Sequence, residues 1–125
     1  MSDKIYGAKN WFFPDAELPP EGEGMMKGHE SIIILNPNNN PAKVRIKCYF
    51  EFPEKPFEFE VTVEAESVCC LRTNVPEQMG GHRIPLETQY AISLHADEPI
   101  IAQYGRLDNR QTNLAFYTTP GYHEA

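Results

Sequence analysis

Hydrophobic and polar residues alternate along two neighbouring stretches of the chain, residues 43–52 and 57–64. One face would carry Val44, Ile46, Cys48, Phe50 and Phe52 in the first stretch and Phe57, Phe59, Val61 and Val63 in the second. Successive side chains of a β-strand point to opposite faces, so the alternation predicts two half-buried strands. Residues 53–56 contain two prolines and predict a hairpin turn between them.

The other face of this predicted hairpin carries basic residues on one strand and mainly acidic residues on the other. Pairing Phe52 with Phe57 would set Arg45 opposite Glu64, Lys43 opposite Glu66 and Lys47 opposite Thr62. The basic stripe would then be neutralised by the neighbouring strand, each exposed pair contributing roughly 0.2–1 kcal/mol. This interpretation argues against a nucleic-acid surface.

Further strand patterns cover residues 32–35, 67–73, 90–95, the start of 99–111, and 113–119. Residues 32–35 are aliphatic throughout, which predicts burial on both faces, and residues 96–99 predict a turn. No window of 11 or more residues has helical periodicity, and residues 76–82 allow at most one helical turn before the glycines. The patterns predict an all-β, antiparallel sandwich or barrel of about seven or eight strands.

The 125 residues suit a single domain, 1–125, because no linker, repeat or low-complexity tract divides them. Residues 1–28 are rich in proline and glycine and predict an irregular N-terminal arm. Residues 121–125 follow a proline and predict a flexible tail.

Charge and cysteine content narrow the classes of function. The formal net charge of -7 opposes unspecific binding to nucleic acid or to anionic membranes. Neither a signal peptide nor an apolar run of membrane-spanning length is present. Cys48, Cys69 and Cys70 form no C-x-x-C pair, which favours reduced thiols and a cytoplasmic location.

The most polar segment of the chain follows a predicted core strand. It brings Gln103, Arg106, Asp108, Arg110 and Gln111 to the carboxyl end of that strand, and the candidate site also includes His29, Glu30 and Arg72. Guanidinium groups bind carboxylates and phosphates through paired hydrogen bonds. These residues are therefore candidates for binding a small polar ligand or a partner chain, for pairing between subunits, or for ordinary ion pairs within the chain.

No metal, cofactor or catalytic residue is assigned from the sequence. The four histidines stand far apart, and only His29 and Glu30 are adjacent, which makes joint metal ligation through both side chains awkward on a strand. No nucleophile elbow, phosphate loop or dinucleotide motif occurs. An enzyme using His29 or Cys70 remains the weakest hypothesis, since Cys70 as a small core residue is the simpler interpretation.

The polar segment also carries a family resemblance. Pro99, Ile100, Ile101, Gln103, Arg106, Leu107, Asp108, Arg110 and Gln111 resemble the sensory rhodopsin transducer family, whose pattern has valine at the position of Ile101. The similarity extends upstream through Pro19-Pro20, Gly22, Gly24, His29-Glu30, Ile34-Leu35-Asn36, Ile84-Pro85 and Tyr90-Ala91. It covers nearly the whole chain in the same order.

This resemblance implies a β-sandwich of jelly-roll character that assembles as a homotetramer. It implies a bacterial, cytosolic and non-catalytic signalling protein that binds a small polar, sugar-like ligand or a partner protein, which in one member is a membrane photoreceptor. The alternative is a tetrameric scaffold or DNA-binding regulator without a small-molecule ligand. No membrane insertion of the chain itself is expected.

Overall fold

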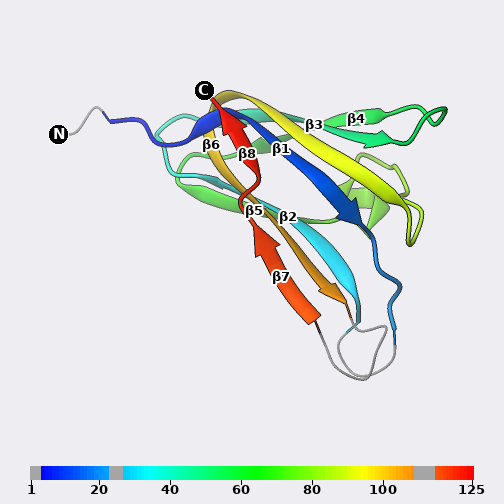
Figure 1. The fold of residues 1–125 in the computed structure, drawn as a ribbon. Helices are drawn as coiled ribbons and strands as arrows, with labels where there is room; N and C mark the ends of the chain where they lie inside the picture. The colour runs from blue at the N-terminus through cyan, green and yellow to red at the C-terminus, as the bar shows by residue number, and fades with distance from the viewer. Residues whose placement is uncertain (1–3, 23–26, 109–114) are drawn as a thin grey trace.

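In a computed structural model, the chain is described over residues 4–22, 27–108 and 115–125. The elements are β1 (Ala8–Glu17), β2 (His29–Asn36), β3 (Ala42–Phe50), β4 (Phe57–Val63), β5 (Ser67–Arg72), the helical turn η1 (Pro76–Gln78), β6 (Gln89–Asp108), β7 (Ala115–Thr119) and β8 (Tyr122–Glu124) (Figure 1). The pairings between these strands are antiparallel. The all-β prediction is confirmed.

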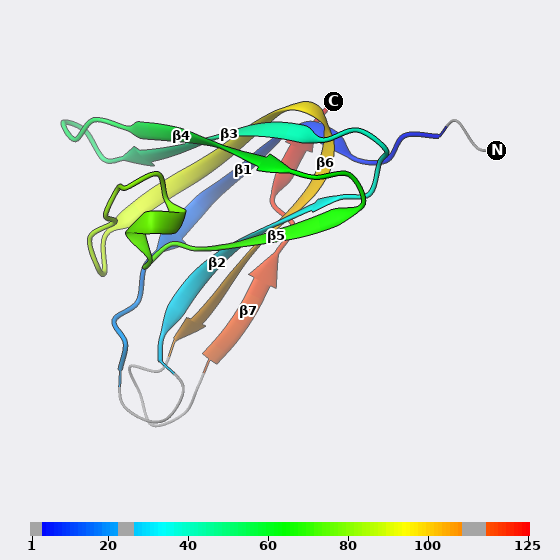
Figure 2. The same cartoon turned by 180° about the vertical axis from the view of Figure 1, so that it is seen from behind.

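The strands form two layers that share the long strand β6. The first layer has the order β4-β3-β6-β1-β8, and in the second β6 continues between β2 and β7, with β5 beside β2. In Figure 2, the second-layer strands β5, β2 and β7 lie below β3 and β4 of the first layer. Residues 90–96 of β6 pair with β3, whereas residues 101–107 pair with β2. One strand therefore fixes both layers relative to each other.

The turn predicted at residues 96–99 is wrong, because this segment lies inside β6. The β6 pairing with β3 ends at Ala96, and the pairing with β2 begins at Ile101. Pro99, which has no backbone N–H to donate, lies between these two ladders. The proline therefore marks a bend between the layers and not the end of a strand.

The prediction of an irregular arm over residues 1–28 is also wrong for much of its length. β1 is a ten-residue strand inside the first layer, between β6 and β8. Pro14 lies within a register shift between Phe13 and Ala16. Since the ladder is interrupted at this point, the missing N–H of the proline costs no regular hydrogen bond.

The predicted flexible tail contains the short strand β8, which pairs with residues 10–12 of β1. Gly121 lies between β7 and β8 with a φ of 72°, and a Cβ here would lie 2.6 Å from Cε1 of Phe13. Glycine accepts both the positive φ and the close approach. The chain can therefore pass from the second layer back to the first and place the His123 ring 4.6 Å from that of Trp11.

The hairpin register differs from the prediction, and the predicted inward face is correct except at Phe52, which lies beyond the end of β3 and is 97% exposed. Arg45 lies opposite Glu60, Lys47 opposite Glu58 and Lys43 opposite Thr62, and Phe57 pairs with Cys48 in place of Phe52. The loop between the strands, residues 51–56, is longer than the one assumed. Because side chains alternate with a period of two, a shift by an even number of positions preserves the inward and outward residues within the two strands.

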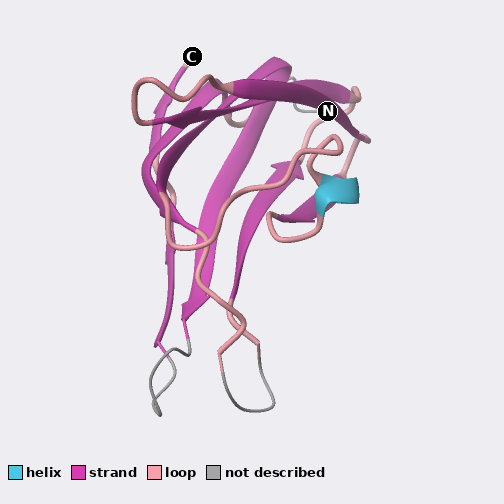
Figure 3. Cartoon of the chain, turned by 90° about the vertical axis from the view of Figure 1, so that its right-hand side faces the viewer, coloured by secondary structure: helices cyan, strands magenta, loops and turns pink. Residues whose placement is uncertain are grey.

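The two layers enclose an apolar core to which both contribute. Ile32 and Ile34 of β2 and Ile46 and Leu94 of the first layer are fully buried. The outer face of the second layer is less well covered, because Leu35 is 39% exposed. Burial of residues 32–35 on both faces is therefore incomplete in one chain. The helical turn η1 lies at the margin of the layers (Figure 3).

Two of the three free thiols should differ sharply in reactivity. Cys48 is buried, and burial followed by the nearby Glu30 charge raises its thiol pKa to about 12, whereas Cys70 is exposed. Because the thiolate is the reactive form, we expect Ellman's reagent at pH 8 to label Cys70 rapidly and Cys48 only after unfolding. Cys70→Ser should remove the rapid phase. A rapid phase that persists in this variant would contradict the assignment.

Candidate functional site

A carboxylate lies at the centre of the candidate site. Glu30 is fully buried, on the inward face of β2 that also carries Ile32. Its Oε1 accepts hydrogen bonds from the hydroxyls of Tyr90 at 2.5 Å and Thr73 at 2.7 Å. Its Oε2 accepts from the Glu17 backbone N–H at 3.0 Å and from the Tyr104 hydroxyl. Because an ionised carboxylate only accepts, all four donors suit its charged form.

The four donors reach Glu30 from separate parts of the chain. Glu17 ends β1, Thr73 follows β5, Tyr90 lies in the first-layer part of β6, and Tyr104 lies in its second-layer part. The Thr73 backbone N–H also donates to the Glu30 carbonyl oxygen at 3.3 Å. One side chain thus joins both layers and both halves of β6. Such a group stabilises the fold only while every partner is in place.

The two tyrosines at this centre resist ionisation. Burial raises the pKa of the Tyr90 hydroxyl well above its usual value, and the negative charge and hydrogen bond of Glu30 raise it further. The same causes raise the pKa of Tyr104, while the nearby Arg106 charge partly opposes the rise. Both hydroxyls therefore stay protonated and remain hydrogen-bond donors at neutral pH.

Arg106 lies beside this centre, directly opposite Glu30 in the pairing of β2 with β6. Its Nη1 donates to the Glu17 carbonyl oxygen at 3.2 Å, and its guanidinium lies 4.8 Å from the ring centre of Tyr117 on β7. Its Nε is buried and has no hydrogen-bond partner among the described residues. Arg106 therefore holds the end of β1 against β7.

The structure divides the other predicted site residues between two faces. Gln103 and Arg72 lie on the outer face of the second layer, where they pair with Ile33 and Ser31 of β2. Asp108 ends β6 two residues after Arg106. The eight candidates are thus not one cluster, although Glu30 and Arg106 are neighbours. Arg110 and Gln111 lie outside the described residues.

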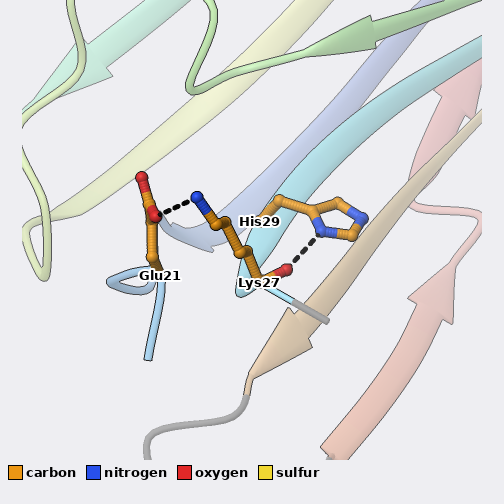
Figure 4. A network of polar contacts seen from close by, with 3 residues as sticks. All are labelled: Glu21, Lys27 and His29. Carbon is orange, nitrogen blue, oxygen red and sulfur yellow. Dashed lines mark hydrogen bonds and ion pairs between the residues drawn. The ribbon is translucent and has the colours of Figure 1, made fainter. Parts of the chain in front are cut away.

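His29 precedes the buried carboxylate but points away from it by strand alternation. Its Nδ1 lies 2.9 Å from the Lys27 carbonyl oxygen, so this nitrogen carries the hydrogen and donates it. Figure 4 shows this contact beside the ion pair of Lys27 with Glu21, in which Nζ and Oε2 are 2.9 Å apart. His29 therefore helps to order the start of β2.

The sequence reasoning missed the four donors to Glu30: Glu17, Thr73, Tyr90 and Tyr104. Strand alternation could have identified Tyr104, which shares the inward face with Ala102 and Arg106. Glu17 donates through its backbone N–H, so the type of its side chain does not indicate that it contacts Glu30. Thr73 lies just beyond the end of β5, but it continues the inward alternation of Leu71 in the predicted strand 67–73, so the same signal could have identified it.

A second polar network lies on the outer face of the first layer. The Tyr49 hydroxyl is 2.8 Å from Ser93 Oγ, which is 2.9 Å from His95 Nε2, and His95 Nδ1 is 2.9 Å from Asn10 Oδ1. Burial, followed by neighbouring basic side chains, lowers the pKa of the imidazole. The serine, histidine and amide are spaced as in a hydrolase, but Ser93 is fully buried and its hydroxyl cannot meet a substrate.

Within the described ranges, no group of three or more histidine, cysteine or acidic side chains could hold a metal ion. In the same part of the chain, no helix has the length and apolar character needed to span a bilayer. Cys70 is exposed and faces outward opposite Ile33, so its interpretation as a small core residue is wrong. The fold and the central carboxylate describe a small two-layered β protein with a buried polar centre.

The chain belongs to the family described as Anabaena sensory rhodopsin transducer, which it matches over residues 6–123. It is similar to Thermotoga maritima 1070, with a TM-score of 0.85 and 33% identity over 96% of this chain and 97% of that one. It is also similar to the Anabaena sensory rhodopsin transducer, with a TM-score of 0.70 and 28% identity over 88% and 98%. No curated protein matches it. The predicted family resemblance is confirmed.

Replacing Glu30 by glutamine should destabilise the fold strongly. The amide would keep the size of the side chain but would turn one acceptor into a donor facing other donors. We expect the free energy of unfolding to fall by about 2–4 kcal/mol, measured by urea denaturation. The exposed Glu60→Gln should change it by less than about 0.5 kcal/mol. Equal effects of the two substitutions would show that the carboxylate network is not the centre of stability.

The buried tyrosines should make the fold sensitive to alkali. Because their pKa values are raised in the folded state, their contribution to stability is complete below about pH 10, the ordinary tyrosine value. Above it, the unfolded chain releases protons that the folded chain retains, so stability falls by up to about 1.4 kcal/mol per pH unit for each tyrosine. Urea denaturation between pH 9 and 11 should show this slope.

Tyr104→Phe is the variant that tests this pH dependence. It should lower stability at pH 8 through the lost hydrogen bond and should make the alkaline slope shallower. An unchanged slope would mean that Tyr104 does not retain its proton in the folded state.

Proposed function

We propose that this chain is a non-catalytic cytoplasmic signalling protein that assembles as a homotetramer and docks a partner protein or a small polar ligand. Membership of the transducer family supports the signalling class. The name of the similar Anabaena protein, a sensory rhodopsin transducer, supports a membrane photoreceptor as the kind of partner. The buried position of Ser93 and the outward position of Cys70 give no support to catalysis.

The observation that carries the assembly is an exposed apolar row on the outer face of the second layer. Leu35 pairs with Val68 on one side and with Ile101 on the other. Val68 is 66% exposed, and Leu35 and Ile101 are each 39% exposed. Adjacent aliphatic side chains in one cross-strand row gain stability when a second apolar surface covers them.

The aliphatic sequence of β2 fits a second copy of the chain as the molecule that covers this row. Residues 32–35 have the pattern of a strand buried on both faces, but one chain buries only the inner face fully. A second copy brings the same apolar row, and such self-complementary faces are usual in symmetric oligomers. Pairing two such faces would complete the burial that the sequence indicates.

Two of the predicted site residues lie on the same face as the apolar row. Gln103 follows Ile101 by two positions on β6, and Arg72 lies farther along β5 from Val68. Side chains separated by an even number of positions share one strand face. They would supply hydrogen bonds at the rim of an assembly or partner interface, while Glu30 and Arg106 keep the layers in place from within.

Val68→Glu tests the assembly. A carboxylate in the middle of an apolar interface would remain unpaired on burial, which is costly. The wild-type chain should sediment with about four times the chain mass of 14.3 kDa. The variant should associate at least about a hundredfold more weakly and retain its β-sheet circular dichroism.

Leu86→Glu is the matched control, because Leu86 is 55% exposed but lies in the connection before β6. It should sediment as the wild-type chain does. A monomeric wild type, or a Val68→Glu variant with unchanged mass, would refute self-association through this face.

A further inference from the structure

A cavity of about 340 Å³ lies where three connections of the fold meet. Its lining comes from the connection after β1, the residues after β5, and residues 83–86 before β6. Its walls include the apolar side chains of Leu18, Ile84 and Leu86, together with three prolines. This volume lies at the lower end of the range of small-ligand pockets, which are largely apolar with a few polar groups.

Backbone contacts hold the walls of this cavity in place. Leu18 forms an isolated bridge with Leu86, and the Glu87 N–H donates to the Leu18 carbonyl oxygen at 2.8 Å. The Gly28 N–H donates to the Glu21 carbonyl oxygen at 2.7 Å, which holds these two lining residues together. The cavity is therefore formed before any ligand arrives, which lowers the entropy cost of binding.

The charges around the cavity leave one cation available. Glu21 is paired with Lys27 at 2.9 Å (Figure 4), so this acidic group is already neutralised. Arg83 also lines the cavity, and no hydrogen bond or ion pair holds its guanidinium within the described part of the chain. A free guanidinium binds a carboxylate through two parallel hydrogen bonds.

Thr73 joins the cavity to the buried carboxylate. It lines the cavity, is 1% exposed, and donates its hydroxyl to Glu30 at 2.7 Å. Its neighbour Asn74 also lines the cavity, and its side-chain amide can donate to a bound oxygen. A ligand in this cavity would thus lie one residue from the group that joins the two layers.

We propose that this cavity binds a small carboxylate with an apolar body. The carboxylate pairs with Arg83, and the body packs between Leu18, Ile84 and Leu86. This inference rests on the proposed binding function and gives its ligand site and chemical class. An apolar body is favoured because the walls offer aliphatic surface, and a carboxylate is favoured because the unpaired group is a single guanidinium.

Benzoate is the probe, with benzyl alcohol as its neutral counterpart and acetate as a carboxylate without the body. Titrations of ¹⁵N-labelled full-length protein, followed by amide chemical shifts, should show saturable benzoate binding with a Kd of about 1 mM or below. The shifts should concentrate at Thr73, Asn74 and residues 83–87. Benzyl alcohol and acetate should each bind at least about tenfold more weakly.

The Arg83→Gln variant separates the contribution of the guanidinium charge to benzoate binding from that of the cavity shape. It should weaken benzoate binding about five- to tenfold and leave the binding of benzyl alcohol unchanged. Arg45→Gln, which removes an exposed guanidinium on β3 outside this cavity, should leave benzoate binding unchanged. Benzoate shifts outside the cavity, no saturable binding, or equal effects of the two arginine variants would overturn the proposal.

These results are independent of the assembly measured with Val68→Glu. If benzoate fails to bind while the wild-type chain is tetrameric, the cavity assignment is wrong and the signalling scaffold stands. If benzoate binds a monomeric wild-type chain, the cavity assignment stands and self-association is wrong.

Discussion

The structure depends on a buried carboxylate, which solvent does not reach and whose hydrogen-bond donors water therefore cannot replace. Glu30 receives donors from the end of β1, from the residue after β5 and from both halves of β6. A charge in an apolar interior is tolerated only when hydrogen bonds compensate for the lost hydration. The four donors must therefore be in place together, so the carboxylate fixes how the two layers meet. Arg106, opposite Glu30 on β6, extends this constraint to β7 through Tyr117.

This arrangement separates a structural interior from recognition surfaces. Inward residues of β2 and β6 belong to the carboxylate network, while outward residues of the same strands form the apolar row together with Val68 of β5. The cavity beside Thr73 lies at a third place, yet it contacts the network through one hydroxyl. A partner on the outer face would thus contact the strands that carry the buried centre, whereas a ligand in the cavity would reach that centre through Thr73.

Much of the fold was predictable because strand alternation is a local property. The pattern correctly placed β3 and β4, and the glycines correctly limited the helix to one turn. The β3–β4 register was wrong, since a shift by an even number of residues leaves the hydrophobic pattern unchanged. Pro14 and Pro99 suggest an irregular arm and a turn, but each lies where a ladder is interrupted, at a position where no donor is needed.

The sequence by itself determined the all-β class and the family, because residue order and side-chain type express these directly, and it named Glu30 and Arg106 only as candidate binding residues. Only the tertiary structure decided that Tyr90, Tyr104 and Thr73 donate to one carboxylate, and that Arg72 and Gln103 lie on a different face from it. Those contacts join residues between 43 and 74 positions apart. Hydrogen bonds across such separations depend on how layers pack, and no local pattern of residues encodes them.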